Sequence, residues 1–235
     1  MKRSHFIILL LTGLSLVTNS QIVITTPYEF TIGGSGGATF SSVSFSPHVP
    51  QSKLPGLTFG LTGRMAMGKN MGLQLELNYA QQGWKEKYET EETPNGEDEQ
   101  PTAQPNYRYN RLLNYVQLPF FTHVRFNGEK ARVFFLAGPQ IGYLLSESTN
   151  ENLQGVSPGR VNAQHNLAVQ KKFEWGISGG GGVEIRTRTG YYLIEGRYLY
   201  ALGDIYNTRR EDSFSKASGQ TISVKLTWLI PLKKK

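Results

Sequence analysis

Apolar and polar residues alternate with a period of two along eight stretches of this 235-residue chain. Such alternation is typical of strands with one apolar and one polar face. Six stretches are regular: Leu57–Met67, Leu73–Tyr79, Val116–Phe126, Phe173–Arg186, Tyr192–Tyr200 and Ile222–Ile230. Two others, about Tyr28–Phe45 and Arg132–Leu145, alternate less cleanly. The pattern therefore predicts an all-β fold of eight strands.

The connections between these stretches alternate in length. The long ones cover about Ser46–Gly56, Glu89–Tyr107, Ser146–Asn166 and Asn207–Gly219, and the short ones cover Gly68–Met71, Asn127–Lys130 and Thr187–Gly190. Bacterial outer-membrane barrels have short periplasmic turns and longer outer loops. The alternation therefore predicts an eight-stranded antiparallel up-and-down transmembrane β-barrel with short periplasmic turns and long outer loops.

Alternation alone does not decide which face points outward, so a soluble lipocalin-like barrel is the alternative. Three observations favour the membrane. The stretches are often longer than the usual soluble strand of ~5–6 residues, and the mixed charges of the polar face would pair inside a narrow barrel. Aromatic residues near the ends of the stretches also predict interfacial girdles; they are Tyr28, Phe30, Tyr107, Tyr109, Tyr191, Tyr192 and Tyr206.

A barrel of eight strands has an interior that its own side chains can fill. We therefore expect the charged residues of the polar face to form a buried network that pairs internally, because an unpaired buried charge is costly. These residues are Arg64, Glu76, Arg125, Glu174, Glu184, Glu195, Arg197 and Lys225. The size predicts a plugged lumen and argues against a general diffusion porin.

The N-terminus has the layout of a secretory signal. Lys2 and Arg3 precede the mostly apolar run Phe6–Val17, and small residues then precede a cleavage site near Ser20/Gln21. A retained membrane anchor is the alternative. We expect residues 1–20 to be a signal peptide and 21–235 to be one barrel domain in the outer membrane. The chain has no cysteine. After the signal no stretch approaches the length of an apolar transmembrane helix, and the mean hydropathy is −0.36, so a helical membrane protein is excluded.

The formal net charge is +7. Its basic residues are scattered along the sequence instead of gathered on one face, so we expect no nucleic-acid partner. The basic tail Lys233–Lys235 is expected in the periplasm or near lipid headgroups.

Several segments together resemble the PorT-like outer-membrane β-barrel family of Bacteroidetes-type bacteria. They are Gln74–Gly83, Asn114–Phe121 (NYVQLPFF), Phe135–Leu145 (FLAGPQIGYLL), Phe173–Gly176 with Gly179–Gly182, and Ile194–Leu202. The resemblance implies an outer-membrane barrel and little about activity. One branch of the family serves protein secretion and gliding, but its distinctive N-terminal region has no match here. The chain also ends Trp228–Lys235 (WLIPLKKK) instead of on the aromatic residue that barrel-assembly machinery reads.

Two glycine-rich segments invite a phosphate-loop interpretation. Such a loop needs a helix N-terminus after the glycines, usually with Lys-Ser/Thr. Gly179–Gly182 is followed instead by the alternating run Val183–Arg186. These glycines, and those of Gly33–Gly37, are therefore expected to mark bends or close backbone approaches within strands.

No pattern of catalytic or metal-ligating residues stands out. The histidines are His5, His48, His123 and His165, and no two have metal-ligand spacing. Three aspartates, together with His165 and Ser148, fall on or near predicted outer loops, but nothing fixes them relative to one another; the aspartates are Asp98, Asp204 and Asp212. We predict no catalytic, cofactor-binding or metal-binding residues and no enzyme activity.

One predicted outer loop is acidic, with Glu89, Glu91, Glu92, Glu97, Asp98 and Glu99 close together. The acids lack the register of a calcium loop, so a solvated loop is the simpler interpretation, and divalent ions shared with lipid headgroups are the alternative.

The sequence predicts a barrel that acts in envelope structure or in recognition through its outer loops. A small-solute channel and an accessory part of a secretion machine are the alternatives. Expected partners are outer-membrane lipid and the barrel-assembly machinery during insertion, with other envelope proteins as a further candidate.

Overall fold

The computed structural model describes residues 28–86, 108–126, 128, 130–152, 167–207 and 214–232. These residues form nine strands: β1 (Tyr28–Ser46), β2 (Gln51–Ser52), β3 (Leu54–Met67), β4 (Met71–Glu86), β5 (Arg108–Arg125), β6 (Ala131–Asn152), β7 (Phe173–Thr187), β8 (Gly190–Asp204) and β9 (Lys216–Pro231). Within the same ranges, no helix is long and apolar enough to cross a membrane. The predicted signal peptide, residues 1–20, lies outside the described residues.

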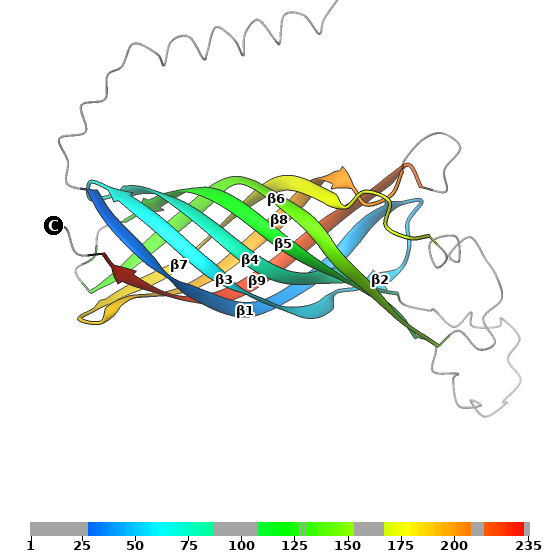
Figure 1. The fold of residues 1–235 in the computed structure, drawn as a ribbon, viewed down its shortest axis with the longest axis horizontal. Helices are drawn as coiled ribbons and strands as arrows, with labels where there is room; N and C mark the ends of the chain where they lie inside the picture. Colours follow the sequence, from blue (N-terminus) through cyan, green and yellow to red (C-terminus); the bar gives the residue numbers. More distant parts are fainter. Residues whose placement is uncertain are drawn as a thin grey trace, which may run out of the picture.

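The eight long strands form a closed ring. Each pairs antiparallel with the next long strand along the chain, and β1 pairs with β9 from Thr31↔Pro231 to Ser46↔Lys216. The short strand β2 adds to β4 through Gln51↔Glu86 and Ser52↔Lys85. Figure 1 shows the strands inclined to the long axis of the barrel. The predicted all-β antiparallel up-and-down fold is confirmed.

The two ends of the ring differ. At one end, here called the turn end, residues 68–70, 126–130 and 188–189 make three short connections, and β1 begins beside the end of β9 (Figure 1). Gly68 has a φ of 63°, which glycine adopts without steric cost. The opposite end, here called the loop end, carries the long connections. The predicted sorting of connections by length is confirmed, while residues 87–107 of the acidic loop lie outside the description.

Three predicted loop boundaries are wrong. β6 continues to Asn152, so that Ser148 pairs with Leu112 on a strand instead of lying in a loop. β9 already begins at Lys216, and Ser46–Gly56 contains β2 and the start of β3 at Leu54. The reason is that backbone pairing continues past the point where apolar alternation ends. Beyond Leu145 the outward and inward side chains of β6 are both polar, so the sequence no longer has the pattern of a strand.

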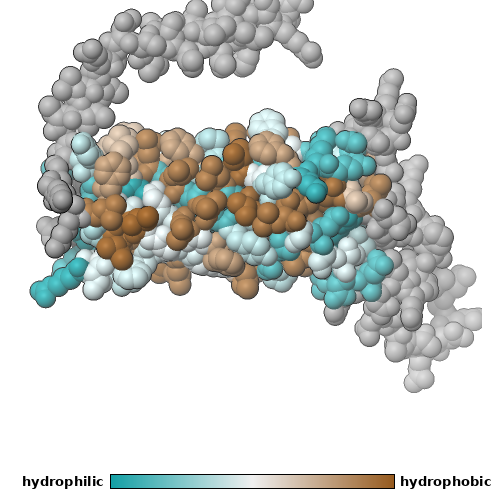
Figure 2. Space-filling model, in the orientation of Figure 1, coloured by the Kyte–Doolittle hydropathy of each residue, from teal (hydrophilic) through white to brown (hydrophobic). Residues whose placement is uncertain are grey.

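The two faces of the wall match the predicted sets. Leu57, Leu61 and Leu226 point outward with 61–62% of their surface exposed, whereas Thr62, Glu76 and Lys225 point inward with 0–2% exposed. Figure 2 shows apolar side chains gathered over the wall, with hydrophilic ones toward the loop end. A wall of this composition is stable only where hydrocarbon replaces water outside, because large exposed apolar patches are otherwise unfavourable.

The predicted aromatic girdle is only partly correct. Tyr28, Phe30 and Tyr192 point outward, each more than 40% exposed. Tyr109, Tyr191 and Tyr206, however, are almost completely buried inside the barrel. Tyr191 and Tyr192 occupy successive positions of β8, so the pleat sends them to opposite faces. Tyr107 lies outside the described residues.

Candidate functional site

The middle of the lumen holds a cluster of four charged side chains, here called the luminal charge cluster: Glu76 of β4, Glu195 and Arg197 of β8, and Lys225 of β9. Arg197 donates from both terminal nitrogens to Glu76, at 2.8 and 2.6 Å, and from Nη2 to Glu195 at 2.6 Å. Lys225 Nζ donates to Glu76 Oε2 at 2.8 Å. With two charges of each sign, the cluster is neutral overall.

Neighbouring polar groups complete the cluster. Gln74 and Asn78 flank Glu76 on the inward face of β4 and donate to its two carboxylate oxygens at 2.6 and 2.8 Å. Thr227 donates to Glu195 at 3.2 Å. The Arg197 guanidinium lies 4.8 Å from the centre of the Phe121 ring. Bidentate, charge-assisted hydrogen bonds of this kind fix side-chain geometry as well as lowering energy. They join β4 to the opposite strand β8 across the middle of the barrel.

A second ion pair lies nearer the turn end. Arg64 of β3 donates to Glu184 of β7, and both side chains are buried. The Arg64 guanidinium also lies 5.3 Å from the Tyr191 ring, whose hydroxyl donates to Glu29 at 2.8 Å. Around them, apolar side chains enter the lumen and leave little open space: Phe121, Phe134, Leu136, Tyr191, Leu193 and Leu229.

The remaining predicted luminal charges have uncharged partners. Arg125 donates to the carbonyl oxygens of Gly68 and Met71, at 3.5 and 3.3 Å. Glu174 accepts a long hydrogen bond of 3.4 Å from Gln117. All eight predicted residues are thus buried in the lumen, and six of them form ion pairs.

Between the charge cluster and the loop end lies a small polar cavity of about 30 Å³, lined by residues that include Thr39, Gln82, Gln140 and Ser178. Such a volume holds on the order of one water molecule. In the part of the chain that the structure describes, side chains therefore fill the barrel interior.

At the loop end the lumen becomes apolar. A group of inward side chains, here called the loop-end core, consists of Val43, Phe45, Val49, Trp84, Tyr109, Leu113, Tyr115, Leu144, Val169, Ile205, Tyr206, Phe214 and Ala217. Phe45 lies at its centre, with ring centroids 5.3 Å from Trp84 and 5.0 Å from Phe214. The sequence interpretation missed this core. Trp84 could have predicted this core from the sequence, because it is apolar and lies in the same inward register of β4 as Glu76.

Arg111 of β5 ties the loop-end core to the surrounding polar groups. It donates to the Tyr206 hydroxyl at 3.1 Å and to Glu147 at 2.7 Å, and its guanidinium lies 5.7 Å from the Trp84 ring. Burial raises the pKa of Tyr206 above its usual range, although Arg111 acts in the opposite direction. Tyr206 therefore stays a neutral hydrogen-bonding group at physiological pH.

The glycine-rich segments lie inside strands. Gly179–Gly182 belongs to β7, and a Cβ atom at Gly180 would lie 2.1 Å from the Gly196 carbonyl oxygen. At Gly182 the corresponding distance to the Ile194 oxygen is 2.0 Å. The predicted close backbone approach is confirmed at these two positions, and the segment does not form the loop-to-helix geometry that phosphate binding requires.

The candidate catalytic and metal-binding types do not come together. His123 is buried in the lumen, stacked on Phe134 with ring centroids 4.6 Å apart. Asp204 ends β8 and accepts a hydrogen bond from the Ala217 amide at 2.7 Å. Within the described ranges, no three His, Cys, Asp or Glu side chains are grouped as metal ligands would be. His5, Asp98, His165 and Asp212 lie outside those ranges.

Three of the solved structures that are similar to this chain are described by their identity, coverage and TM-score. Ail, the attachment invasion locus protein of Yersinia pestis, is 13% identical, with 86% of this chain and 99% of that one covered and a TM-score of 0.40. Neisserial surface protein A is 12% identical, with 85% and 96% covered and a TM-score of 0.41. Outer Membrane Protein W of E. coli is 13% identical, with 86% and 98% covered and a TM-score of 0.32. At such identities and scores the likeness carries no information about ligand or activity.

No curated protein matches the sequence. The family model described as "Outer membrane protein beta-barrel domain" matches residues 19–207, which is most of the chain and includes seven of the eight long strands. This match agrees with the closed antiparallel ring, its apolar outer wall and its charged interior. The chain therefore belongs to the outer membrane protein β-barrel domain family.

Proposed function

We propose that this outer-membrane barrel is non-catalytic and non-conducting, and that it acts in envelope structure or in recognition at its loop end. The observation that carries the proposal is the blocked lumen. The luminal charge cluster joins β4, β8 and β9 across the interior, and the loop-end core closes the space above it. A solute would have to break several charge-assisted hydrogen bonds to pass.

The placement in the membrane follows from general rules for such barrels. Short turns face the periplasm and long loops face outward, so the turn end of this chain would be periplasmic. The outer wall would contact membrane lipid, and the barrel-assembly machinery would insert the protein. Within its family, the motifs Asn114–Phe121 and Phe135–Leu145 support a PorT-like relationship.

Single-channel recording in planar lipid bilayers tests the blocked lumen. The refolded protein should show no sustained open level. A matched variant, Trp84→Ala with Phe45→Ala, removes part of the loop-end core but leaves the charge cluster intact, and it should stay closed as well. Steady conductance of the native protein would overturn the proposal and favour the small-solute channel.

A deletion strain separates envelope structure from loop-end recognition. It would be complemented with the native gene or with a variant whose residues 89–105 are replaced by a Gly-Ser linker of equal length. Equal recovery of detergent resistance by both genes would support a structural role for the barrel itself. Recovery by the native gene alone would support recognition through the acidic loop. Stable co-purification of secretion components would instead favour the accessory role.

A further inference from the structure

The outer wall of the barrel has a groove along β1. Most outward positions of the wall carry large apolar side chains, but those in the middle of β1 are Gly34, Gly36 and the small Ala38. Ile32 and Phe40 resume the apolar pattern on either side, with 50% and 40% of their surface exposed. The groove is therefore a stretch of the wall in which β1 carries no large side chain.

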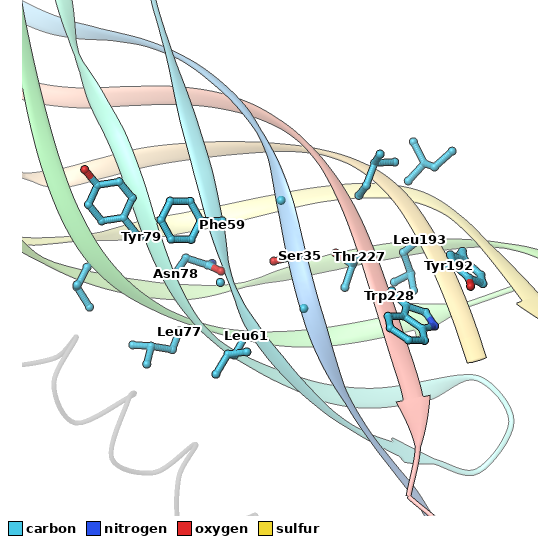
Figure 3. A pocket seen from close by; sticks show the side chains of 16 residues that line it. Ser35, Phe59, Leu61, Leu77, Asn78, Tyr79, Tyr192, Leu193, Thr227 and Trp228 are labelled. Atoms are coloured by element: carbon cyan, nitrogen blue, oxygen red, sulfur yellow. The ribbon is translucent and has the colours of Figure 1, made fainter. Parts of the chain in front are cut away.

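The strand register shows how the groove is bounded. In one row of paired residues, Gly34 lies between Trp228 of β9 and Leu61 of β3. In the next outward row, Gly36 lies between Leu226 and Phe59. The rows continue on β8 and β4 with Tyr192, Ile194, Leu77 and Tyr79. Figure 3 shows Phe59 and Tyr79 on one side of β1, and Trp228 and Tyr192 on the other.

The two outward glycines are not required by packing. A Cβ atom at Gly34 would meet nothing closer than the Gly60 oxygen at 3.8 Å, and one at Gly36 nothing closer than the Thr58 oxygen at 3.9 Å. The inward glycines of the same strand differ, since a Cβ at Gly33 or Gly37 would lie 1.7 or 2.0 Å from a carbonyl oxygen of β9. Larger residues would fit at the outward positions, and their absence is what leaves the groove open.

The groove has the size and chemistry of a ligand site. Its volume is about 960 Å³, near the upper end of the ~300–1,000 Å³ typical of small-molecule pockets. Its lining is almost wholly apolar. Because this wall faces the hydrocarbon of the membrane, a hydrocarbon chain is the occupant that matches it.

The turn end supplies positive charge that an anionic lipid headgroup could contact. Each of the three short turns carries an exposed basic residue, namely Lys69, Lys130 and Arg188. Arg188 is adjacent to Thr189, whose hydroxyl lies 3.3 Å from that of Tyr192 at the edge of the groove. Tyr192 in turn stacks on Trp228, with ring centroids 6.2 Å apart. The turn that adjoins the turn-end edge of the groove thus carries an exposed basic residue, which would attract an anionic lipid headgroup.

We propose that the groove binds one anionic phospholipid of the leaflet at the turn end, with an acyl chain lying over Gly34 and Gly36 and the headgroup beside Arg188. This site goes beyond the proposed function, since it exists whether or not the lumen conducts. It differs from general lipid contact because it selects a headgroup and depends on two glycines.

Trp228 lies in the groove and serves as the reporter. The variant Trp84→Phe with Trp175→Phe keeps Trp228 as the single tryptophan of the chain. It would be placed in vesicles that contain increasing fractions of phosphatidylglycerol or phosphatidylcholine with brominated acyl chains, which quench tryptophan fluorescence on contact. Half-maximal quenching of Trp228 should need about fivefold less brominated phosphatidylglycerol than phosphatidylcholine, the discrimination expected from one basic residue near the surface.

Two sets of variants define the site. In the same background, Gly34→Leu with Gly36→Leu fills the groove and should abolish the preference. Gly196→Leu is the matched control, because Gly196 is another outward glycine, with no atom within 4 Å of its Cβ position and no place in the lining. Arg188→Gln should also abolish the preference and Arg188→Lys should retain it, which provides a test if the leucine variant does not fold. A variant whose single tryptophan is Trp175, on the outward face of β7, should be quenched equally by the two brominated lipids.

Equal quenching of Trp228 by the two lipids would overturn the proposal, as would a preference that survives both the leucine pair and Arg188→Gln. Protection of Trp228 from both brominated lipids would also overturn it, because a second copy of the chain would then cover the groove. Heat-modifiable gel migration shows in each case whether the variant has folded.

Discussion

Strand β4 passes through two environments that differ in which of its faces is apolar. Near the turn end, Leu75 and Leu77 point outward while Glu76 points inward. Near the loop end, Lys85 points outward, and Trp84 is completely buried inside. The strand keeps its period of two throughout, but its apolar face changes sides along the barrel.

The difference reflects the solvent outside each zone of the barrel, which is lipid in one and water in the other. In the part of the barrel whose outward residues are apolar, such as Leu75 and Leu77, here called the membrane zone, lipid solvates the outer face. The polar interior there has to satisfy its own charges through Glu76, Arg197 and their neighbours. In the loop-end zone, water solvates the outside, and the loop-end core is buried as in a soluble protein. One barrel therefore combines an interior held by ion pairs with one held by aromatic packing.

The largest effect is expected in the luminal charge cluster. Arg197→Met should lower the free energy of unfolding by about 5 kcal/mol, because Glu76 and Glu195 lose a shared buried partner. Adding Glu195→Gln restores charge balance and should recover at least half of the loss. Urea unfolding of the refolded protein in vesicles measures both. A double variant as unstable as the single one would mean that charge balance does not hold this zone together.

The loop-end core should respond to loss of volume. Trp84→Ala should cost about 3–4 kcal/mol, since the ring is fully buried and its removal leaves a cavity. Trp175→Ala is the matched control in the membrane zone, where lipid fills the vacated space and only part of that cost applies. Equal costs in the same unfolding assay would contradict the contrast between the two zones.

The boundary between the zones can be located on a single strand face. Leu77→Lys places a charge on the lipid-facing wall and should cost about 2–3 kcal/mol. Lys85→Leu, on the same face of β4 beyond the membrane zone, should change stability by no more than about 0.5 kcal/mol. Unfolding free energies in vesicles test the pair, and a large effect of Lys85→Leu would move the boundary toward the loop end.

The smallest effect concerns one hydrogen bond of the loop-end core. Tyr206→Phe removes the hydroxyl that accepts from Arg111 and should cost about 1 kcal/mol. The loss is limited because Arg111 keeps its ion pair with Glu147. The unfolding free energy of Tyr206→Phe is compared with that of Phe214→Tyr, which adds a hydroxyl to the same core instead of removing one. A loss above that of Trp84→Ala would show that polar anchoring, and not ring packing, dominates the loop end.

Much of the membrane zone could be predicted from the sequence. Alternation in Leu73–Tyr79 and Ile222–Ile230 assigned each side chain to a face, because the pleat fixes directions once a strand is recognised. The same alternation predicted that Glu76, Arg197 and Lys225 share the lumen. It did not predict that Arg197 bridges two carboxylates, since that depends on the relative heights of β4 and β8 across the barrel.

The loop end was predicted less well. Tyr109 and Tyr206 were assigned to an outer girdle, although they pack inside with Trp84. Position near the end of a strand does not distinguish a lipid-facing aromatic residue from a buried one. Likewise, the continuation of β6 through Ser148 follows from pairing with β5 and has no apolar signal of its own.

By itself, the sequence determined the strands, their faces and the sorting of connections, because these follow from a period of two and from the residues that break it. Only the tertiary structure decided which charges meet, where the interior changes from ionic to aromatic, and that Gly34 and Gly36 open a groove in the wall. Those features arise from ring closure, which brings β1 beside β9 and places distant strands across one narrow lumen.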